Sequence, residues 1–99
     1  MKRLLFVGII AIFSLSLSVQ AQNNVGIGTT TPNASALLDL TATDMGLLVP
    51  RVALTITTSA APVTSPATSL LVYNTATVND VTPGFYYWNG SAWVQVGAG

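Results

Sequence analysis

The chain contains no cysteine and no histidine, and only 6% of its residues carry a charge. Without cysteine it can form no disulfide, and without cysteine or histidine it lacks the usual ligands of a structural zinc ion. Glutamate is missing as well, so most of the side chains that act as catalytic acids, bases or nucleophiles are absent. We therefore expect a protein that is not an enzyme, with no catalytic residues, no metal site and no cofactor.

Residues 1–21 have the three parts of a secretory signal peptide. Lys2 and Arg3 form a basic start, an apolar run follows, and small residues precede a cleavage position between Ala21 and Gln22. The apolar run is shorter than the roughly 20 residues that a membrane-spanning helix needs. We therefore expect a chain that is secreted or displayed at the cell surface, with no membrane span after cleavage.

Cleavage would remove two of the three cations. Arg51 then remains against Asp39, Asp44 and Asp80, which gives a net charge of −2. Nucleic acid and anionic membrane surfaces are excluded as partners, because both require a basic patch. Threonine and other neutral polar residues must take the positions that face water, and threonine suits an exposed β-strand. Such a composition is typical of extracellular fibres built from β-structure.

The chain that remains, residues 22–99, is short for a self-sufficient fold. Small folds of this kind usually need disulfides, a metal ion or oligomerisation, because they bury little apolar surface. The composition excludes the first two remedies. We therefore expect residues 22–99 to be weakly folded alone or to associate with other copies of themselves.

Short apolar stretches separated by glycine, proline and threonine indicate an all-β fold of short strands and hairpins joined by extended Thr/Pro-rich loops. The strands are expected at residues 25–28, 37–40, 47–49 and 70–73. Pro50 should end the third of these, because proline donates no hydrogen bond to a sheet.

The composition divides the chain into parts. After the signal peptide, residues 22–52 form a fibre-like β module, and residues 53–69 form a loop or linker rich in threonine, serine and proline. A short strand at residues 54–58 is an alternative within that loop. Residues 70–99 contain a strand followed by an aromatic β-hairpin.

The hairpin is centred on Asn89 and Gly90, a pair that tolerates the positive φ angles of tight turns. A two-residue turn would place Trp88 opposite Ser91. A four-residue loop would instead place Trp88 opposite Trp93. Both arrangements gather the aromatic rings on one small sheet.

Three of these rings, Tyr86, Trp88 and Trp93, are candidates for contact with a ligand or partner. Flat rings with polar edges can stack on a glycan or on a protein surface. The alternative is that they form the core of the module or a subunit interface. Exposure distinguishes these roles, since a ligand platform must face solvent.

Two further patterns have weak chemical interpretations. Gly26 and Gly28 could begin a phosphate-binding loop, but the Gly-Lys-Ser/Thr sequence of such a loop does not follow. Close packing of the backbone near a fibre axis explains them better. Asp39 and Asp44 could be a catalytic pair, but hydrated turn acids are the simpler interpretation.

Four blocks taken in order carry a family resemblance: VGIGTTTPNASALLDL, MGLLVPRVAL, SPATSLLVYNTATV and VTPGFYYWNGSAWVQVG. Over residues 24–97 they resemble the N-terminal module of secreted, phage-tail-fibre-like bacterial proteins. The resemblance implies an extended β-rich fibre, homotrimeric and exported. Longer relatives continue beyond such a module and often end in an intramolecular chaperone domain that drives trimerisation. The ending Gly97-Ala98-Gly99 resembles the start of a linker, so we expect this chain to be the start of a longer product, and a stand-alone short member is the alternative.

Two functions follow from the sequence. The first is a non-catalytic structural module of a secreted or cell-surface fibre, used for surface structure or adhesion, whose main partner is itself as a homotrimer. The alternative is an extracellular binding module whose aromatic hairpin contacts a glycan or a protein.

Overall fold

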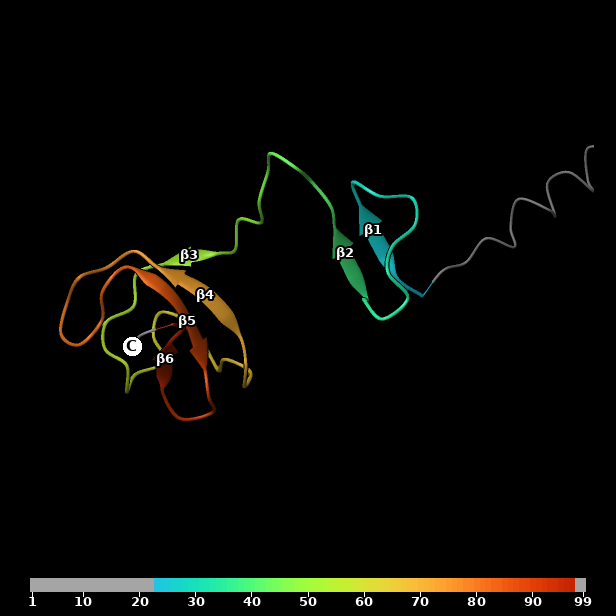
Figure 1. Cartoon of the computed structure of the whole chain (residues 1–99). Helices are drawn as coiled ribbons and strands as arrows, with labels where there is room; N and C mark the ends of the chain where they lie inside the picture. Colours follow the sequence, from blue (N-terminus) through green and yellow to red (C-terminus); the bar gives the residue numbers. More distant parts are fainter. Residues whose placement is uncertain (1–22, 98–99) are drawn as a thin grey trace, which may run out of the picture. The chain divides into compact units, whose positions relative to one another are not determined.

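The computed structural model describes residues 23–97, and within them it contains six short β-strands and no helix (Figure 1). The predicted all-β class is confirmed. The strands form two separate sheets in two compact units, the first ending at Gly46 and the second beginning at Leu47. The division comes before the boundary expected at residue 52, because Arg51–Val52 pairs with a strand of the second sheet. The predicted signal peptide lies outside the described residues.

The first unit holds a parallel pair of three-residue strands. β1 is Val25–Ile27 and β2 is Leu38–Leu40. Their register places Val25 beside Leu38 and Ile27 beside Leu40. Backbone bonds at both ends close the pair, from Val25 N to the Leu37 carbonyl at 2.7 Å and from Thr41 N to the Ile27 carbonyl at 2.9 Å.

The loop between β1 and β2 is held by polar side chains. Asp39 accepts a hydrogen bond from Asn33 N at 2.8 Å and another from the Thr41 hydroxyl at 3.1 Å. Asn33 in turn accepts from Ser35 N at 3.0 Å. Asp39 is therefore used to fix the loop, as expected for a turn acid.

The second unit holds a four-stranded sheet in the order β3-β4-β5-β6. β3 pairs with β4 in parallel, and the other two pairings are antiparallel. The strands are β3 Arg51–Val52, β4 Leu71–Asn74, β5 Gly84–Trp88 and β6 Trp93–Gln95.

The strand expected at residues 47–49 is wrong, because the strand in this region begins at Arg51. Proline has no N–H, but its carbonyl can still accept, and Pro50 accepts from Tyr73 N at 2.9 Å. Pro50 therefore comes directly before a strand, although it was expected to end one.

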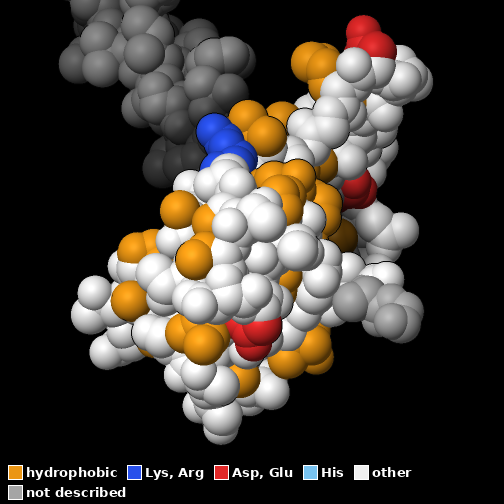
Figure 2. Space-filling model, turned by 90° about the vertical axis from the view of Figure 1, so that its left-hand side faces the viewer, with side chains coloured by type: hydrophobic (Ala, Val, Ile, Leu, Met, Phe, Trp, Pro, Cys, Tyr) orange, Lys and Arg blue, Asp and Glu red, His pale blue; other side chains and the backbone are white. Residues whose placement is uncertain are grey.

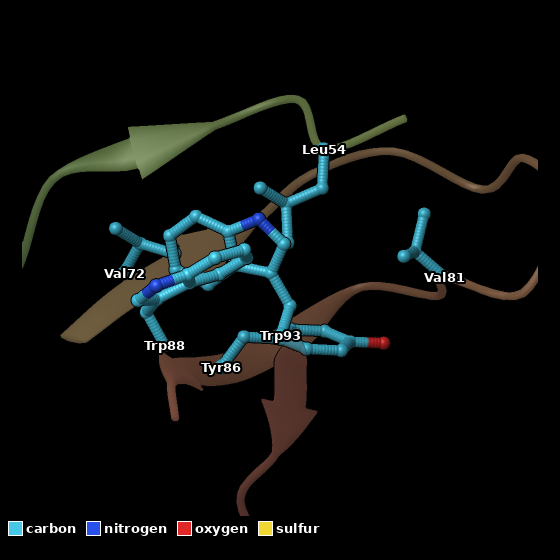
Figure 3. Close-up of a cluster of buried hydrophobic side chains, with 6 residues drawn as sticks. All are labelled: Leu54, Val72, Val81, Tyr86, Trp88 and Trp93. Carbon is cyan, nitrogen blue, oxygen red and sulfur yellow. The ribbon is translucent and has the colours of Figure 1, made fainter. Parts of the chain in front are cut away.

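One face of this sheet carries the core of the second unit, drawn in Figure 3. Trp88 and Trp93 meet edge to face, with ring centroids 5.1 Å apart. The core consists of six buried apolar residues: Leu54, Val72, Val81, Tyr86, Trp88 and Trp93. A single polar side chain is buried with them in the described residues, that of Asn74.

The β5–β6 hairpin has the four-residue loop. Trp88 pairs with Trp93, so the two-residue alternative is wrong. The Asn89 side chain explains the choice, because its Oδ1 accepts from Ser91 N at 2.9 Å and from Ala92 N at 2.8 Å. Gly90 supplies the positive φ, at 101°, that the loop requires.

Residues 53–69 run as a loop against the core, and no strand is formed at residues 54–58 in this part of the described chain. Leu54 is fully buried in the core. Trp93 holds the loop twice, since its backbone N donates to the Thr57 carbonyl at 2.8 Å and its Nε1 to the Ser59 carbonyl at 3.0 Å. These bonds make the segment part of the second unit and not a spacer between units.

Asp80 also holds this loop, and its ionisation should make the second unit sensitive to acid. Its carboxylate accepts bonds from the Thr57 hydroxyl and from Thr57 N, the latter at 2.9 Å. The side-chain bond, followed by the backbone bond, lowers the pKa of Asp80 below its usual value. The stabilisation is therefore complete above the ordinary aspartate pKa of about 4 and is lost as the pH falls through the lower folded pKa.

We expect Asp80→Asn to melt at a lower temperature than the parent at pH 7, with the two melting temperatures converging toward pH 2. The melt is measured by near-UV circular dichroism of the tryptophans, which lie in this unit. Asp44→Asn, in the other unit, is the control and should follow the parent at every pH. A constant difference between Asp80→Asn and the parent across the whole pH range would contradict this assignment.

Candidate self-association surfaces

The three aromatic residues singled out from the sequence lie inside the second unit. Tyr86, Trp88 and Trp93 are at most 8% exposed. The polar atoms of two of them are already used, because Tyr86 Oη accepts from Thr82 N at 3.1 Å and Trp93 Nε1 donates to the Ser59 carbonyl. Figure 3 shows the Tyr86 hydroxyl pointing toward the segment that carries Val81. The burial favours the core interpretation of these rings over a contact with ligand.

The other two rings of the hairpin point to the opposite side. Side chains alternate along a strand, so Phe85 and Tyr87 lie on the face away from Tyr86 and Trp88, and both are exposed. This alternation was visible in the sequence and could have separated the two pairs of rings.

The outer side of the second unit contains an apolar groove of about 250 Å³. Tyr73 and Phe85 form its wall, with ring centroids 5.2 Å apart and nearly perpendicular planes. Arg51 borders it and donates from Nη1 to the Val49 carbonyl at 2.8 Å. The full lining is Leu47, Leu48, Val49, Arg51, Tyr73 and Phe85.

The first unit exposes a second apolar surface, which we call the N-terminal apolar face. Side chains of residues that are paired across two strands point to the same side of the sheet, and so do those two positions apart on one strand. Two cross-strand pairs of this sheet, which we call layers, therefore share this face. Each of the four side chains remains between 42 and 59% exposed. The four residues are Val25 and Leu38 in one layer and Ile27 and Leu40 in the other.

The opposite face of the same small sheet is covered by the chain itself. A Cβ added at Gly26 would lie 2.8 Å from the Thr29 carbonyl oxygen and 3.2 Å from Pro32 Cβ. Asp39, the residue beside Gly26, bonds to the same loop through Asn33 N. The loop therefore closes one side of the sheet and leaves the N-terminal apolar face open.

The two glycines considered for a phosphate loop have local structural explanations. Gly26 lies against the loop. Gly28 has a φ of +82°, and a Cβ added to it would lie only 2.0 Å from the Thr41 carbonyl oxygen. Close backbone packing was the expected role, and it occurs here within one chain.

The described residues contain no group of three or more potential metal ligands among His, Cys, Asp and Glu. Across residues 23–97 there is also no helix long and apolar enough to cross a membrane. The surface is instead mostly neutral, and Figure 2 shows hydrophobic side chains reaching it with few charged ones among them. Apolar contact is the interaction that such a surface supports best.

Comparison with known proteins identifies a family. Residues 26–98 match the family model described as a phage tail like trimerisation region. The matched range contains the lining of the groove and all of the N-terminal apolar face except Val25, and the description of the family suggests that the chain associates with itself as a trimer. No curated protein and no solved structure matches the chain. The match covers most of the chain and confirms the resemblance to phage-tail-like proteins, so the chain belongs to the phage tail-like trimerisation region family.

Proposed function

We propose that this chain is a non-catalytic structural module that assembles into a homotrimer within a secreted or cell-surface fibre. The family match supports self-association. The observation that carries the proposal is that every residue from 23 to 46 is at least partly exposed, so the described part of the first unit has no core of its own.

Two three-residue strands make a sheet that is at best marginally stable alone. Folds below about 40 residues usually need disulfides, metals or oligomerisation, and an isolated two-stranded sheet is marginal in water. The chain has no cysteine and no histidine. Association with further copies is the remedy that the sequence leaves open.

Export is part of the proposal and is supported by the predicted signal peptide at residues 1–21. A role in surface structure or adhesion follows from a fibre outside the cell. The alternative, a glycan- or protein-binding hairpin, is disfavoured because the rings it requires, Tyr86, Trp88 and Trp93, are buried.

The experiment is to express the full chain in a Gram-negative host and recover it from the periplasm or medium. Mass spectrometry should show cleavage after Ala21, and sedimentation equilibrium should give three times the mass of the processed chain. An uncleaved cytoplasmic chain would contradict export, and a monomer at micromolar concentration would contradict the trimer.

A further inference from the structure

We propose that the N-terminal apolar face is the three-fold contact of the assembly, occupied by the same face of two other copies of this chain. This proposal rests on the proposed homotrimer. It adds which surface forms the contact, what covers that surface, and which unit folds before assembly. The first unit would acquire its core only when three copies meet, whereas the second unit folds around its own.

The two faces of the first sheet differ, and this difference supports the proposed contact. One side is closed by the loop through Gly26 and Asp39, and the other presents only aliphatic side chains. A sheet with one covered and one open apolar face needs a partner on the open face, because burial of that face is its main source of stability.

Three-fold symmetry fits the chemistry of this face. Around a three-fold axis the same residue of each copy lies at the same level, so the Val25–Leu38 layer and the Ile27–Leu40 layer would each gather two side chains per copy. A charge at the axis would face its own copies, and repulsion between them would be strong where water is excluded. The four positions carry no charge, while Asp39 points to the covered side.

The groove of the second unit is the weaker candidate for the primary contact. It borders Arg51, so a three-fold contact there would bring the three guanidinium groups of the copies toward one another. The second unit also has a core of six buried residues and does not need a partner to bury them. The groove is retained as the competing location in the experiment.

The adjacent residues Leu37 and Leu38 provide a matched pair of variants. Leu38 is in β2 and on the face, whereas Leu37 precedes the strand and is even more exposed, at 77%. We expect the double variant Ile27→Asn/Leu38→Asn, in the full processed chain, to raise the concentration needed for half-assembly by about 100-fold or more. Leu37→Asn should assemble as the parent does.

Near-UV circular dichroism shows whether a variant has merely misfolded. Trp88 and Trp93 lie in the core of the second unit, so their signal should be the same in the dissociated double variant as in the parent. Loss of this signal in the double variant would contradict the independence of the second unit that the proposal requires.

Cross-linking gives a second measurement that does not depend on stability. The chain has no cysteine, so a single Ile27→Cys substitution places three identical thiols near the axis. Mild oxidation of the assembled protein should then yield a disulfide-linked dimer in non-reducing gels. Leu37→Cys should remain monomeric on the same gels.

The outcomes separate the two proposals. A parent chain that is monomeric overturns the homotrimer and the three-fold contact together. A trimeric parent that survives Ile27→Asn/Leu38→Asn but is dissociated by Leu48→Asn/Phe85→Asn keeps the proposed function and overturns the N-terminal face as the contact. Dissociation by Leu37→Asn as strong as that by the double variant would show that the contact is not confined to the N-terminal apolar face.

Discussion

Replacing Asn74 with leucine is expected to unfold the second unit at room temperature. The Asn74 side chain is fully buried and makes four hydrogen bonds. Its Oδ1 accepts from Leu54 N at 2.9 Å and from Ala76 N at 3.0 Å, and its Nδ2 donates to the carbonyls of Ala76 at 2.9 Å and Thr82 at 2.8 Å. One side chain therefore joins the loop before β4, the turn after it and the segment before β5.

The expected cost follows from the partners that would be left unpaired. Leucine fills the volume but satisfies none of the four backbone groups, and each loss costs about 1 kcal/mol or more. The sum of about 4 kcal/mol is comparable with the whole stability of a unit of this size, roughly 3–8 kcal/mol. Near-UV circular dichroism and the wavelength of tryptophan emission should both report exposed tryptophans.

Asn74→Asp separates the two halves of this network. A carboxylate keeps the two acceptor bonds from Leu54 N and Ala76 N but presents oxygen, not N–H, to the other two carbonyls. Burial and these carbonyls disfavour the charged form, so this variant should become more stable as the pH falls and the carboxyl is protonated. Asn23→Leu, which makes the same exchange at an exposed position, is the control. Its free energy of unfolding should lie within about 0.5 kcal/mol of that of the parent. A fully folded Asn74→Leu variant would contradict the role of the network.

Replacing Gly28 with alanine is expected to abolish assembly. The residue has a φ of +82°, where a side chain costs about 1 kcal/mol, and its new Cβ would lie 2.0 Å from the Thr41 carbonyl oxygen. That overlap is with backbone, so it can be relieved only by moving β1 away from the segment that follows β2. The bond from Thr41 N to the Ile27 carbonyl would then be lost, together with the register that aligns the N-terminal apolar face.

Gly46→Ala is the matched control, because a Cβ there would meet no atom within 4 Å. Sedimentation velocity should show the parent and Gly46→Ala assembled and Gly28→Ala dissociated at the same concentration, with the tryptophan signal of the second unit unchanged in all three. Assembly of Gly28→Ala with parent affinity would show that the sheet of the first unit is not required for the contact.

The local features of the fold were predictable from sequence because they depend on neighbouring residues. Strand-like alternation, the Asn89–Gly90 turn and the all-β class each follow from residues within one short segment. The parallel pairings were not predictable, because each joins strands separated by a long connection. The start of β3 at Arg51 depends on Tyr73, a residue 22 positions away whose N–H bonds to the Pro50 carbonyl.

The candidate surfaces were predictable only in part. Val25 and Ile27 alternate with glycine, and Leu38 and Leu40 flank an acid, so each strand shows an apolar side in the sequence. That the two apolar sides coincide depends on register, which a shift of one residue would reverse. Asn74 gave no signal beyond that of an ordinary strand-ending polar residue, since its importance depends on three segments that only the fold brings together.

The loop before β4 has a consequence for how this sequence can vary. It is held to the second unit largely through its main chain: the Thr55 carbonyl accepts from Asn79 Nδ2 at 2.7 Å, and the carbonyls of Thr57 and Ser59 accept from Trp93. Main-chain groups are common to all residues, so most side chains of the loop can be exchanged without removing an anchor. Mutational scanning should find the loop permissive at Thr55 and intolerant at Asn79 and Trp93, the residues that recognise it.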